Sequence, residues 1–334
     1  MLGPLLSKPY SDLSNRNSVL DHNPMTFTSI SINHSRTGAS LHTRLALPEH
    51  PRAIVQINHG MAEHGGRYER FADALVEAGF GAVAHDHRGH GHTTAPGTSL
   101  GYMGARGGWE ALVDEIEAVR VHVRKERPGV PLVTFGHSMG AIAALTHALR
   151  HPHSTDALAL WNSGVETSAL TAVFGVILKV QRAFKGSDTP SELARKATFD
   201  TWNKQFAPNR TDFDWLSRDE AEVDAYISDP LCGFPISVGM WQDVLSGVRF
   251  CADDENFKAL PSDLPVHLLA GEKDPCTDGG KAVANIEARM KARGMRDVTL
   301  RLLPDTRHES LNELNRERTT QDFVAWLEER FPKG

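Results

Sequence analysis

The stretch "PLVTFGHSMGAIAALTHALR", residues 131–150, decides the fold. An apolar, strand-like run leads into the motif G-H-S-M-G at 136–140, and a run with helical spacing follows at once. In this order of strand, sharp turn and helix, a G-x-S-x-G motif raises its serine hydroxyl above the edge of a sheet, and its glycines leave room where strand and helix cross. The pattern therefore predicts Ser138 as a nucleophile; the alternative is a serine that only caps a helix.

Short apolar runs and helical spacing alternate along most of the chain. The other apolar runs lie at 53–58, 81–86, 157–162, 266–271 and 298–303, and helical spacing occurs at 68–78, 109–127, 139–151, 279–292 and 317–330. Strands that alternate with helices predict crossover units, and hence a mostly parallel α/β sheet flanked by helices on both faces. Near the start, "FTSISIN" and "LHTRLAL" alternate in polarity around a turn, which predicts a hairpin.

A long insertion interrupts this alternation. Roughly a hundred residues separate the apolar runs at 157–162 and 266–271, which is too many for one crossover. We predict that the insertion contains a mainly helical cap over the carboxyl edge of the sheet, where ligands bind in open α/β folds. The predicted division is an N-terminal extension at 1–25, an α/β core at 26–163 and 236–334, and the cap at 164–235.

The cap begins with an apolar run, "TSALTAVFGVILKVQRAF" at 167–184, which has helical spacing and no charge before Lys179. The run is short for a membrane span and carries Lys179 and Arg182 near its end. Two interpretations stay open. The run is either a helix packed on its neighbours or a lid that faces the substrate or touches a membrane surface.

Charge and cysteine content restrict the class of protein. The net charge is −6 and no basic run is present, so nucleic-acid binding is not expected. The cysteines, Cys232, Cys251 and Cys276, form no C-x-x-C pair, which indicates reduced thiols. No basic segment precedes the short apolar run at the N-terminus, so no secretory signal is expected. These features predict a cytoplasmic protein, with peripheral membrane association through the cap as a further expectation.

A serine hydroxyl becomes a good nucleophile only when a base takes its proton. In α/β-hydrolases the order along the chain is serine, acid, histidine. Asp274 follows the apolar run at 266–271 and His308 follows the last such run, so both lie at the same sheet edge as Ser138. We therefore predict that Asp274 orients the imidazole of His308, which acts as the base. Asp278 and Asp305 are alternative acids, although both positions are more typical of a turn or a helix cap.

Hydrolysis of an acyl group also needs two donors for the developing oxyanion. One is expected to be the backbone N–H of Met139, the residue after the nucleophile. The other is expected from the loop after "AIVQINHG", at the backbone N–H of Met61.

Five segments together resemble the α/β-hydrolase family, in its monoacylglycerol lipase/lysophospholipase-like (serine aminopeptidase-like) branch. They are "NHGMAEHGGRYERFA", "HDHRGHGHT", "FGHSMGA", "GEKDP" and "RHESLNE", in family order. The resemblance implies an α/β-hydrolase fold and a serine esterase or lipase that forms an acyl-enzyme. It also implies small acyl-ester or lipid substrates such as monoacylglycerols or lysophospholipids, and no cofactor. An amide or peptide hydrolase of the proline iminopeptidase type is the alternative function.

The resemblance also implies a role for Glu63 and Arg67, which match the glutamate and arginine of the "HGxxEHxxRY" pattern. In this branch they lie near the polar end of the pocket, so we expect them to order the oxyanion loop or to contact a polar head group. One departure bears on this. Animal monoacylglycerol lipases have a second histidine three residues after the catalytic one, and Leu311 stands there in this sequence.

The histidine-rich stretch "HDHRGHGHTT", residues 85–94, suggests a metal site at first sight. His85, His87 and His90 have spacing compatible with a metallo-hydrolase cluster, but Gly89 stands where the ligand aspartate belongs. The family instead has a D-x-x-G-H-G-x-[ST] turn here, which Asp86 begins. We therefore expect a glycine-rich loop beside the site and no bound metal, with a metal-dependent hydrolase as the rival interpretation.

Overall fold

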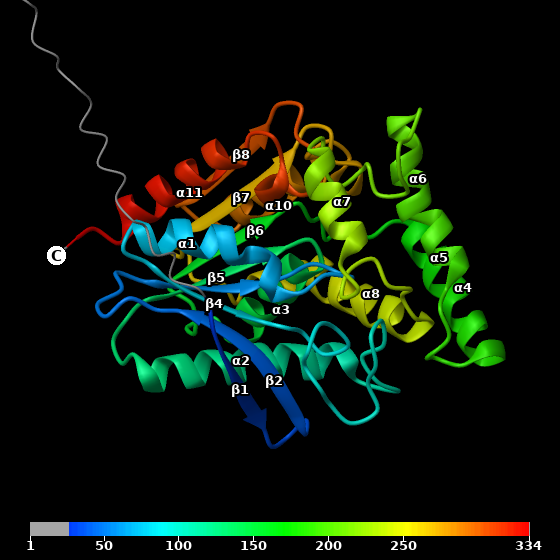
Figure 1. Cartoon of the computed structure of the whole chain (residues 1–334), viewed down its shortest axis with the longest axis horizontal. Coiled ribbons are helices and arrows are strands. Elements are labelled where there is room, and N and C mark those ends of the chain that lie inside the picture. Colours follow the sequence, from blue (N-terminus) through cyan, green and yellow to red (C-terminus); the bar gives the residue numbers. More distant parts are fainter. Residues whose placement is uncertain (1–26, 334) are drawn as a thin grey trace, which may run out of the picture.

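The computed structural model describes residues 27–333, which form an eight-stranded sheet between two layers of helices (Figure 1). The strands are β1 (Thr28–His34), β2 (Ala39–Ala46), β3 (Ile54–Asn58), β4 (Gly81–His85), β5 (Leu132–His137), β6 (Ala157–Trp161), β7 (Val266–Gly271) and β8 (Val298–Leu303). Their order in the sheet is β1-β2-β4-β3-β5-β6-β7-β8. The pairs β1–β2 and β2–β4 are antiparallel and all others are parallel. The predicted hairpin and mostly parallel sheet are confirmed, whereas the predicted extension at 1–25 lies outside the described residues.

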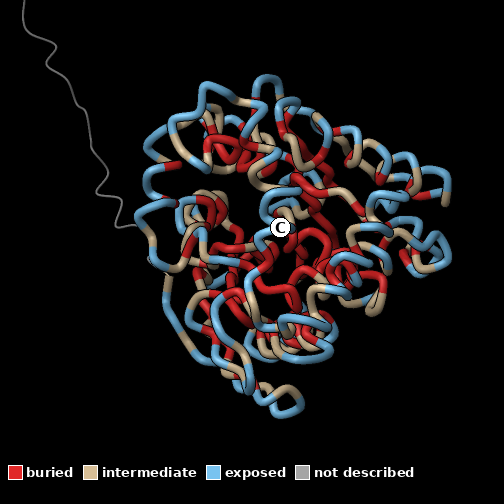
Figure 2. Tube along the Cα trace, turned by 90° about the vertical axis from the view of Figure 1, so that its right-hand side faces the viewer, coloured by how far each residue is buried: buried red, intermediate tan, exposed pale blue. Residues whose placement is uncertain are grey.

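The central strands are buried along their whole length because both faces of the sheet are covered. In β6, Ala157, Ala159 and Trp161 pack in one apolar cluster, and Leu158 and Leu160 pack in another on the opposite face. Every residue of this strand is buried. The burial view shows the same arrangement, with buried residues gathered at the centre and exposed residues in the outer loops (Figure 2).

Helices cover both faces of the sheet. One layer contains α1 (Glu69–Glu77) and α11 (Arg316–Arg330), and the other contains α2 (Gly108–Glu126), α3 (Met139–Arg150), α8 (Val238–Ala252) and α10 (Lys281–Ala292). Short 3-10 helices occur at η1 (Gly65–Tyr68), η2 (Lys204–Phe206), η3 (Pro275–Thr277) and η4 (Ser310–Asn312). The arrangement confirms the predicted α/β architecture.

The insertion between β6 and β7 is helical and gathers at one end of the sheet, on the right in Figure 1. It contains α4 (Ala169–Lys185), α5 (Glu192–Ala197), α6 (Phe199–Asn203), α7 (Glu220–Ser228), α8 and α9 (Asp254–Phe257). Val238 and Met240 of α8 pack in the same buried cluster as α3. Leu178 and Ala194 of the cap helices belong to this cluster too, so the cap boundary at residue 235 stays a prediction.

Helix α4 has two different apolar faces. Gly175 and Leu178 are buried on the inner face, whereas the outer face exposes a set of large apolar side chains: Leu170, Val173, Val176, Ile177, Val180 and Phe184. A capping box between Ser168 and Thr171 begins the helix. The helix therefore packs on its neighbours and also presents an apolar surface outward. Within residues 27–333, no helix has the length and apolarity needed to cross a membrane.

Candidate active site

Ser138 stands at the sharp turn between β5 and α3, with a backbone φ of 53°. A side chain at Gly136 would collide with the carbonyl oxygen of Gly140, and one at Gly140 would collide with the carbonyl oxygen of Asn58. The Ser138 N–H donates to the carbonyl oxygen of Trp161 at 2.9 Å, which fixes the turn to the neighbouring strand. The strained conformation is therefore held by close backbone packing that only glycine permits at 136 and 140.

The loops after β7 and β8 bring Asp274 and His308 to the same sheet edge as Ser138. The distance from Nε2 of His308 to Oγ of Ser138 is 3.0 Å, and that from Nδ1 to Oδ1 of Asp274 is 2.9 Å. Asp274 is fully buried and His308 is 3% exposed. Because Asp274 can only accept, Nδ1 of His308 carries the proton and Nε2 is free to accept from the serine hydroxyl.

Two further groups hold Asp274 in place. The backbone N–H of Cys276 donates to Oδ1 at 2.9 Å, and Nδ2 of Asn162 donates to Oδ2 at 3.2 Å. The hydroxyl of Ser310 donates to Oδ1 of Asn162 at 2.9 Å. Neither Asn162 nor Ser310 was predicted from the sequence, and the only available signal was the position of Asn162 at the end of an apolar strand.

The alternative acids lie elsewhere. The side chain of Asp278 is 77% exposed and pairs with Nζ of Lys281 at 2.9 Å. Asp305 occupies a turn with a φ of 54°. His308 makes no hydrogen bond with either of them. The structure thus brings Asp274, and not Asp278 or Asp305, to the imidazole.

The surroundings of His308 favour its protonated form. Burial alone would lower the pKa of His308, but the negative charge of Asp274 and its hydrogen bond to the ring outweigh burial and raise that pKa above 6.5. The neighbouring ring of His137 lies 4.9 Å away and stays neutral, since burial lowers the pKa of His137 to about 3. His308 is therefore the group at this site that can exchange a proton near neutral pH.

Two backbone N–H groups near the serine have no acceptor. Those of Met61 and Met139 donate to no other group within residues 27–333, and both residues line the same cavity as Ser138. The dipole of α3 also points its positive end toward the turn at Ser138. Free N–H groups are what the predicted oxyanion donors require, and their role stays a prediction.

A cavity of about 700 Å³ opens above Ser138 and His308 beneath the cap helices. Its wall is mainly apolar and aromatic, and includes Ile142, Phe174, Phe199, Trp202, Trp215, Phe234, Ile236, Trp241, Val244, Leu245 and Val248. The carboxylates at its outer part, such as Glu166 and Glu192, are exposed. The volume lies within the ~300–1,000 Å³ typical of sites that enclose small organic ligands.

The sequence of this chain matches that of the family described as serine aminopeptidase, S33, over residues 49–315. The chain belongs to this family. Among its relatives, the monoacylglycerol lipase of Mycolicibacterium smegmatis is 26% identical over 278 residues, which cover 83% of this chain and 88% of that protein. Human monoglyceride lipase is 29% identical over 261 residues, which cover 77% of this chain and 76% of that protein.

A solved structure agrees with the fold of this S33 hydrolase. A thermostable carboxyl esterase from Bacillus coagulans, in complex with glycerol, superposes with a TM-score of 0.83 at 24% identity, over 92% of this chain and 99% of that one. This likeness concerns the fold alone. The predicted α/β-hydrolase fold and the monoacylglycerol lipase-like branch are confirmed, and the enzyme class is that of the carboxylic ester hydrolases.

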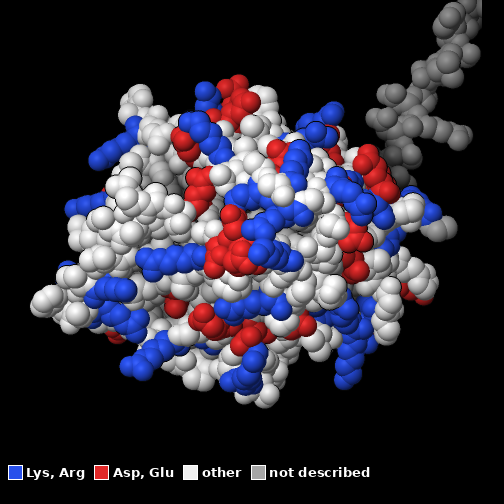
Figure 3. Space-filling view, turned by 180° about the vertical axis from the view of Figure 1, so that it is seen from behind, with Lys and Arg blue, Asp and Glu red and all other residues white. Residues whose placement is uncertain are grey.

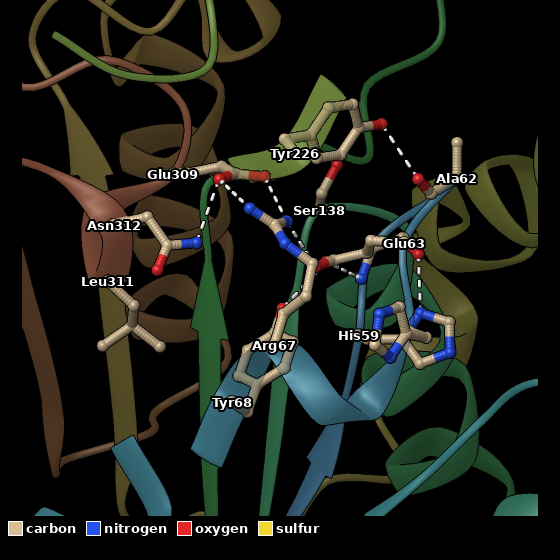
Figure 4. A network of polar contacts seen from close by, with 12 residues as sticks. His59, Ala62, Glu63, Arg67, Tyr68, Ser138, Tyr226, Glu309, Leu311 and Asn312 are labelled. Carbon is tan, nitrogen blue, oxygen red and sulfur yellow. Dashed lines mark hydrogen bonds and ion pairs between the residues drawn. The ribbon is translucent and has the colours of Figure 1, made fainter. Parts of the chain in front are cut away.

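A buried charged network connects two loops of the S33 hydrolase's site (Figure 4). Arg67 donates to both carboxylate oxygens of Glu309, at 2.6 and 2.7 Å, and to Glu63 at 2.8 Å. Glu63 also accepts from the backbone N–H of Gly60 and, at 2.9 Å, from the hydroxyl of Tyr68. The loop before α1 is therefore joined through Arg67 to the residue that follows His308. Glu309 was not predicted, although its place beside His308 was a usable signal.

One guanidinium cannot neutralise two carboxylates. Burial opposes ionisation of Glu309, but its two-point contact with Arg67 outweighs burial and holds the pKa of Glu309 well below its ordinary value. At Glu63 burial dominates over the attraction of Arg67 and raises the pKa of that carboxyl. Glu309 is thus the charged partner of Arg67, and Glu63 is the carboxyl that accepts from the oxyanion loop.

The histidine-rich loop packs below the oxyanion loop. The backbone N–H of His87 donates to Nε2 of His59 at 2.9 Å, so His59 carries its proton on Nδ1 and donates to the carbonyl of Gly60 at 2.7 Å. The carboxylate of Asp86 accepts from Arg44 at 2.6 Å and from the backbone N–H groups of Gly65 and His92 at 2.9 and 2.8 Å. These contacts agree with the expected loop beside the site.

Within residues 27–333, one group of three side chains places its ligand atoms close enough for a metal ion: His64, Asp229 and Cys232. Nε2 of His64 already donates to Asp229 at 2.8 Å, because Nδ1 accepts from the backbone N–H of Gly66. A ligating histidine normally donates its second ring N–H instead. The group is therefore better suited to hydrogen bonding than to metal binding, and it includes none of the histidines at 85–92.

Proposed function

We propose that this chain hydrolyses carboxylic esters through an acyl-enzyme. Ser138 attacks the carbonyl carbon while its proton passes to Nε2 of His308, and Asp274 stabilises the resulting imidazolium. The N–H groups of Met61 and Met139 bind the oxyanion. His308 then protonates the departing alcohol, water attacks the acyl group, and the acid leaves. The unbroken chain of hydrogen bonds from Ser138 through His308 to Asp274 carries this proposal.

We propose monoacylglycerols or lysophospholipids as the substrate class. The apolar wall of the cavity suits one acyl chain, and the relatives that are named monoacylglycerol and monoglyceride lipase support a glycerol ester. The test compares p-nitrophenyl butanoate, octanoate and dodecanoate with monooleoylglycerol and a lysophosphatidylcholine. We expect monooleoylglycerol or the lysophospholipid to give the highest kcat/KM, and a preference for butanoate would contradict the assignment.

An amide hydrolase is the second candidate, because the family to which the chain belongs is described as serine aminopeptidase. A free α-amine needs an unpaired carboxylate near the nucleophile, but the buried carboxyls there, Glu63 and Glu309, are both bound to Arg67. The other carboxylates of the cavity, such as Glu166, are exposed to solvent, which weakens an ion pair. Ester hydrolysis is therefore favoured. Aminoacyl-arylamides compared with monooleoylglycerol distinguish the two, since an aminopeptidase would have the higher kcat/KM for the arylamides.

We propose that Glu63 and Arg67 order the oxyanion loop. Both oxygens of Glu63 are in use, one by Gly60 and Tyr68 and the other by Arg67. A group whose acceptors are already taken is a poor ligand for a substrate hydroxyl. The contact with the N–H of Gly60 fixes the peptide that precedes the one carrying the Met61 N–H, which supports the ordering role over contact with a head group.

The proposed base predicts a pH dependence. His308 must be neutral to accept the serine proton, and its pKa in the folded enzyme lies above 6.5. We expect kcat/KM for a soluble p-nitrophenyl ester to fall tenfold per pH unit on the acid side, with a midpoint above pH 6.5. Stopped assays between pH 5 and 9, with unfolding monitored by circular dichroism, measure it. A midpoint below pH 6 would contradict the proposed stabilisation by Asp274.

We propose that the outer face of α4 contacts an anionic lipid surface. Its exposed apolar side chains are flanked by Lys179 and Lys185, which also lie exposed on the helix. A helix with an apolar face between lysines binds at the interface of an anionic bilayer. In the view from behind, the end occupied by the cap, on the left, shows uncharged surface with Lys and Arg side chains around it (Figure 3).

Removal of the most exposed apolar groups of α4 tests this contact. Leu170 and Phe184 are 81% and 86% exposed, and neither lines the cavity. We expect Leu170→Ala/Phe184→Ala to weaken co-sedimentation with phosphatidylglycerol vesicles at least tenfold, because burial of each side chain contributes about 1.5–3 kcal/mol. Hydrolysis of a soluble p-nitrophenyl ester should stay unchanged. Leu314→Ala removes a 62% exposed leucine elsewhere and should bind vesicles like the parent; equal binding by the double variant would contradict the contact.

A further inference from the structure

Ala62, the residue between Met61 and Glu63, holds the oxyanion loop in a strained conformation. Its φ is 57°, in the left-handed region that residues with a side chain rarely adopt. Such a conformation persists only where surrounding contacts over-determine it. The contacts that hold Ala62 therefore contribute to the direction of the Met61 N–H.

Those contacts come from the inserted segment between β6 and β7. The carbonyl oxygen of Ala62 accepts from the hydroxyl of Tyr226 at 2.9 Å and from the backbone N–H of Gly233 at 2.9 Å. Figure 4 shows the tyrosine hydroxyl directed at this carbonyl. On the other side of Met61, the N–H of Gly60 is held by Glu63. The carbonyl of Gly60 also accepts from Nδ1 of His59 at 2.7 Å, so Met61 is bracketed between two core contacts and two contacts from the insertion.

The tyrosine is itself firmly placed on α7. It is 6% exposed, its ring packs against Phe213 at 5.2 Å, and the guanidinium of Arg67 lies 4.9 Å from the ring centre. Burial raises the pKa of the Tyr226 hydroxyl well above its ordinary value, so the group remains a neutral donor at all working pH values.

We infer that Tyr226 is a positioning residue that aligns the Met61 N–H for the oxyanion by holding the carbonyl of Ala62, an inference that rests on the proposed function. The insertion therefore takes part in the chemistry as well as in forming the cavity. Because Gly233 and Glu63 still hold the loop when Tyr226 is changed, the loss is smaller than removal of an oxyanion donor, which costs about 10²–10³-fold in kcat.

The test is Tyr226→Phe, which removes one hydroxyl and keeps the ring. We expect kcat for a soluble p-nitrophenyl ester to fall about tenfold with KM unchanged, since a misplaced donor acts on the transition state. The affinity of a trifluoromethyl ketone, whose adduct with Ser138 carries an oxyanion, should fall by a similar factor. Titration with a fluorophosphonate counts active sites, so kcat refers to folded enzyme only.

Tyr102→Phe is the matched control. The hydroxyl of Tyr102 bonds to that of Ser187 at 2.9 Å, away from the cavity, so its loss should leave kcat and the ketone affinity unchanged. Values within twofold of the parent for Tyr226→Phe would overturn the inference, as would a rise in KM at constant kcat, which would indicate substrate contact. Equal losses of kcat in both variants would also overturn it. Turnover retained by Ser138→Ala would refute the proposed function itself, whatever Tyr226→Phe does.

Discussion

Ser138→Ala is expected to lower kcat on the order of 10⁶-fold, to the residual rate that binding and the oxyanion donors supply. The reason is that, within residues 27–333, Oγ of Ser138 is the only hydrogen-bond partner of Nε2 of His308, at 3.0 Å. The measurement is single-turnover and steady-state hydrolysis of a p-nitrophenyl ester, together with labelling by a fluorophosphonate, which should vanish.

Ser246→Ala is the control for this change. Ser246 lies exposed on α8, and its hydroxyl donates to the carbonyl of Asp243 outside the cavity. We expect wild-type turnover and labelling in this variant and unchanged circular dichroism in both. Residual activity above about one per cent in Ser138→Ala, kept in the absence and lost in the presence of a chelator, would favour a metal-dependent hydrolase.

Asp274→Asn is expected to lower kcat about 10⁴-fold, because an asparagine can present its amide N–H to Nδ1 of His308 and stabilise the wrong tautomer. The carboxylate now accepts from that ring nitrogen at 2.9 Å and offsets the charge of the imidazolium. Both contributions disappear in the amide. Steady-state kinetics should show the loss in kcat, with little change in KM.

Asp278→Asn separates the two acids suggested by the sequence. Its carboxylate is exposed and paired with Lys281, so this variant should keep kcat within about twofold of the parent. The reverse outcome, an active Asp274→Asn and an inactive Asp278→Asn, would show that the acid has been assigned to the wrong position.

The fold was predictable because its signals are local. Each apolar run, such as that at 157–162, contains a strand in the structure. A strand buried on both faces favours apolar residues, whereas the edge strand at 298–303 is only partly buried. The turn at Ser138 was predictable for a similar reason. Its glycines are required by close backbone contacts, both within a few residues of the motif and with the neighbouring strand. Strand-end positions then indicated Asp274 and His308, because parallel strands deliver their carboxyl ends to one edge.

The contacts that hold the oxyanion loop were not predictable, because they join segments that are far apart in the sequence. Tyr226 reaches Ala62 across 164 positions of the sequence. The sequence gives no sign that Glu309, beside His308, binds Arg67, which lies 242 positions away along the chain. No periodicity or spacing in the sequence indicates such contacts. These contacts nevertheless determine how firmly the oxyanion loop is held.

The packed imidazoles beneath the site link the enzyme's folding to proton uptake. Burial lowers the pKa of His85 and His90 to about 4 and places those of His59 and His87 well below 6.5. The unfolded chain binds these protons near pH 6.5 and the folded one does not. The free energy of unfolding is therefore unaffected by these groups above pH 6.5. Below pH 6.5 each group lowers it by up to about 1.4 kcal/mol per pH unit, until the pH reaches the pKa of that group in the folded state. Acidification below pH 6.5 would thus destabilise this hydrolase from within its core, with no change at its surface required.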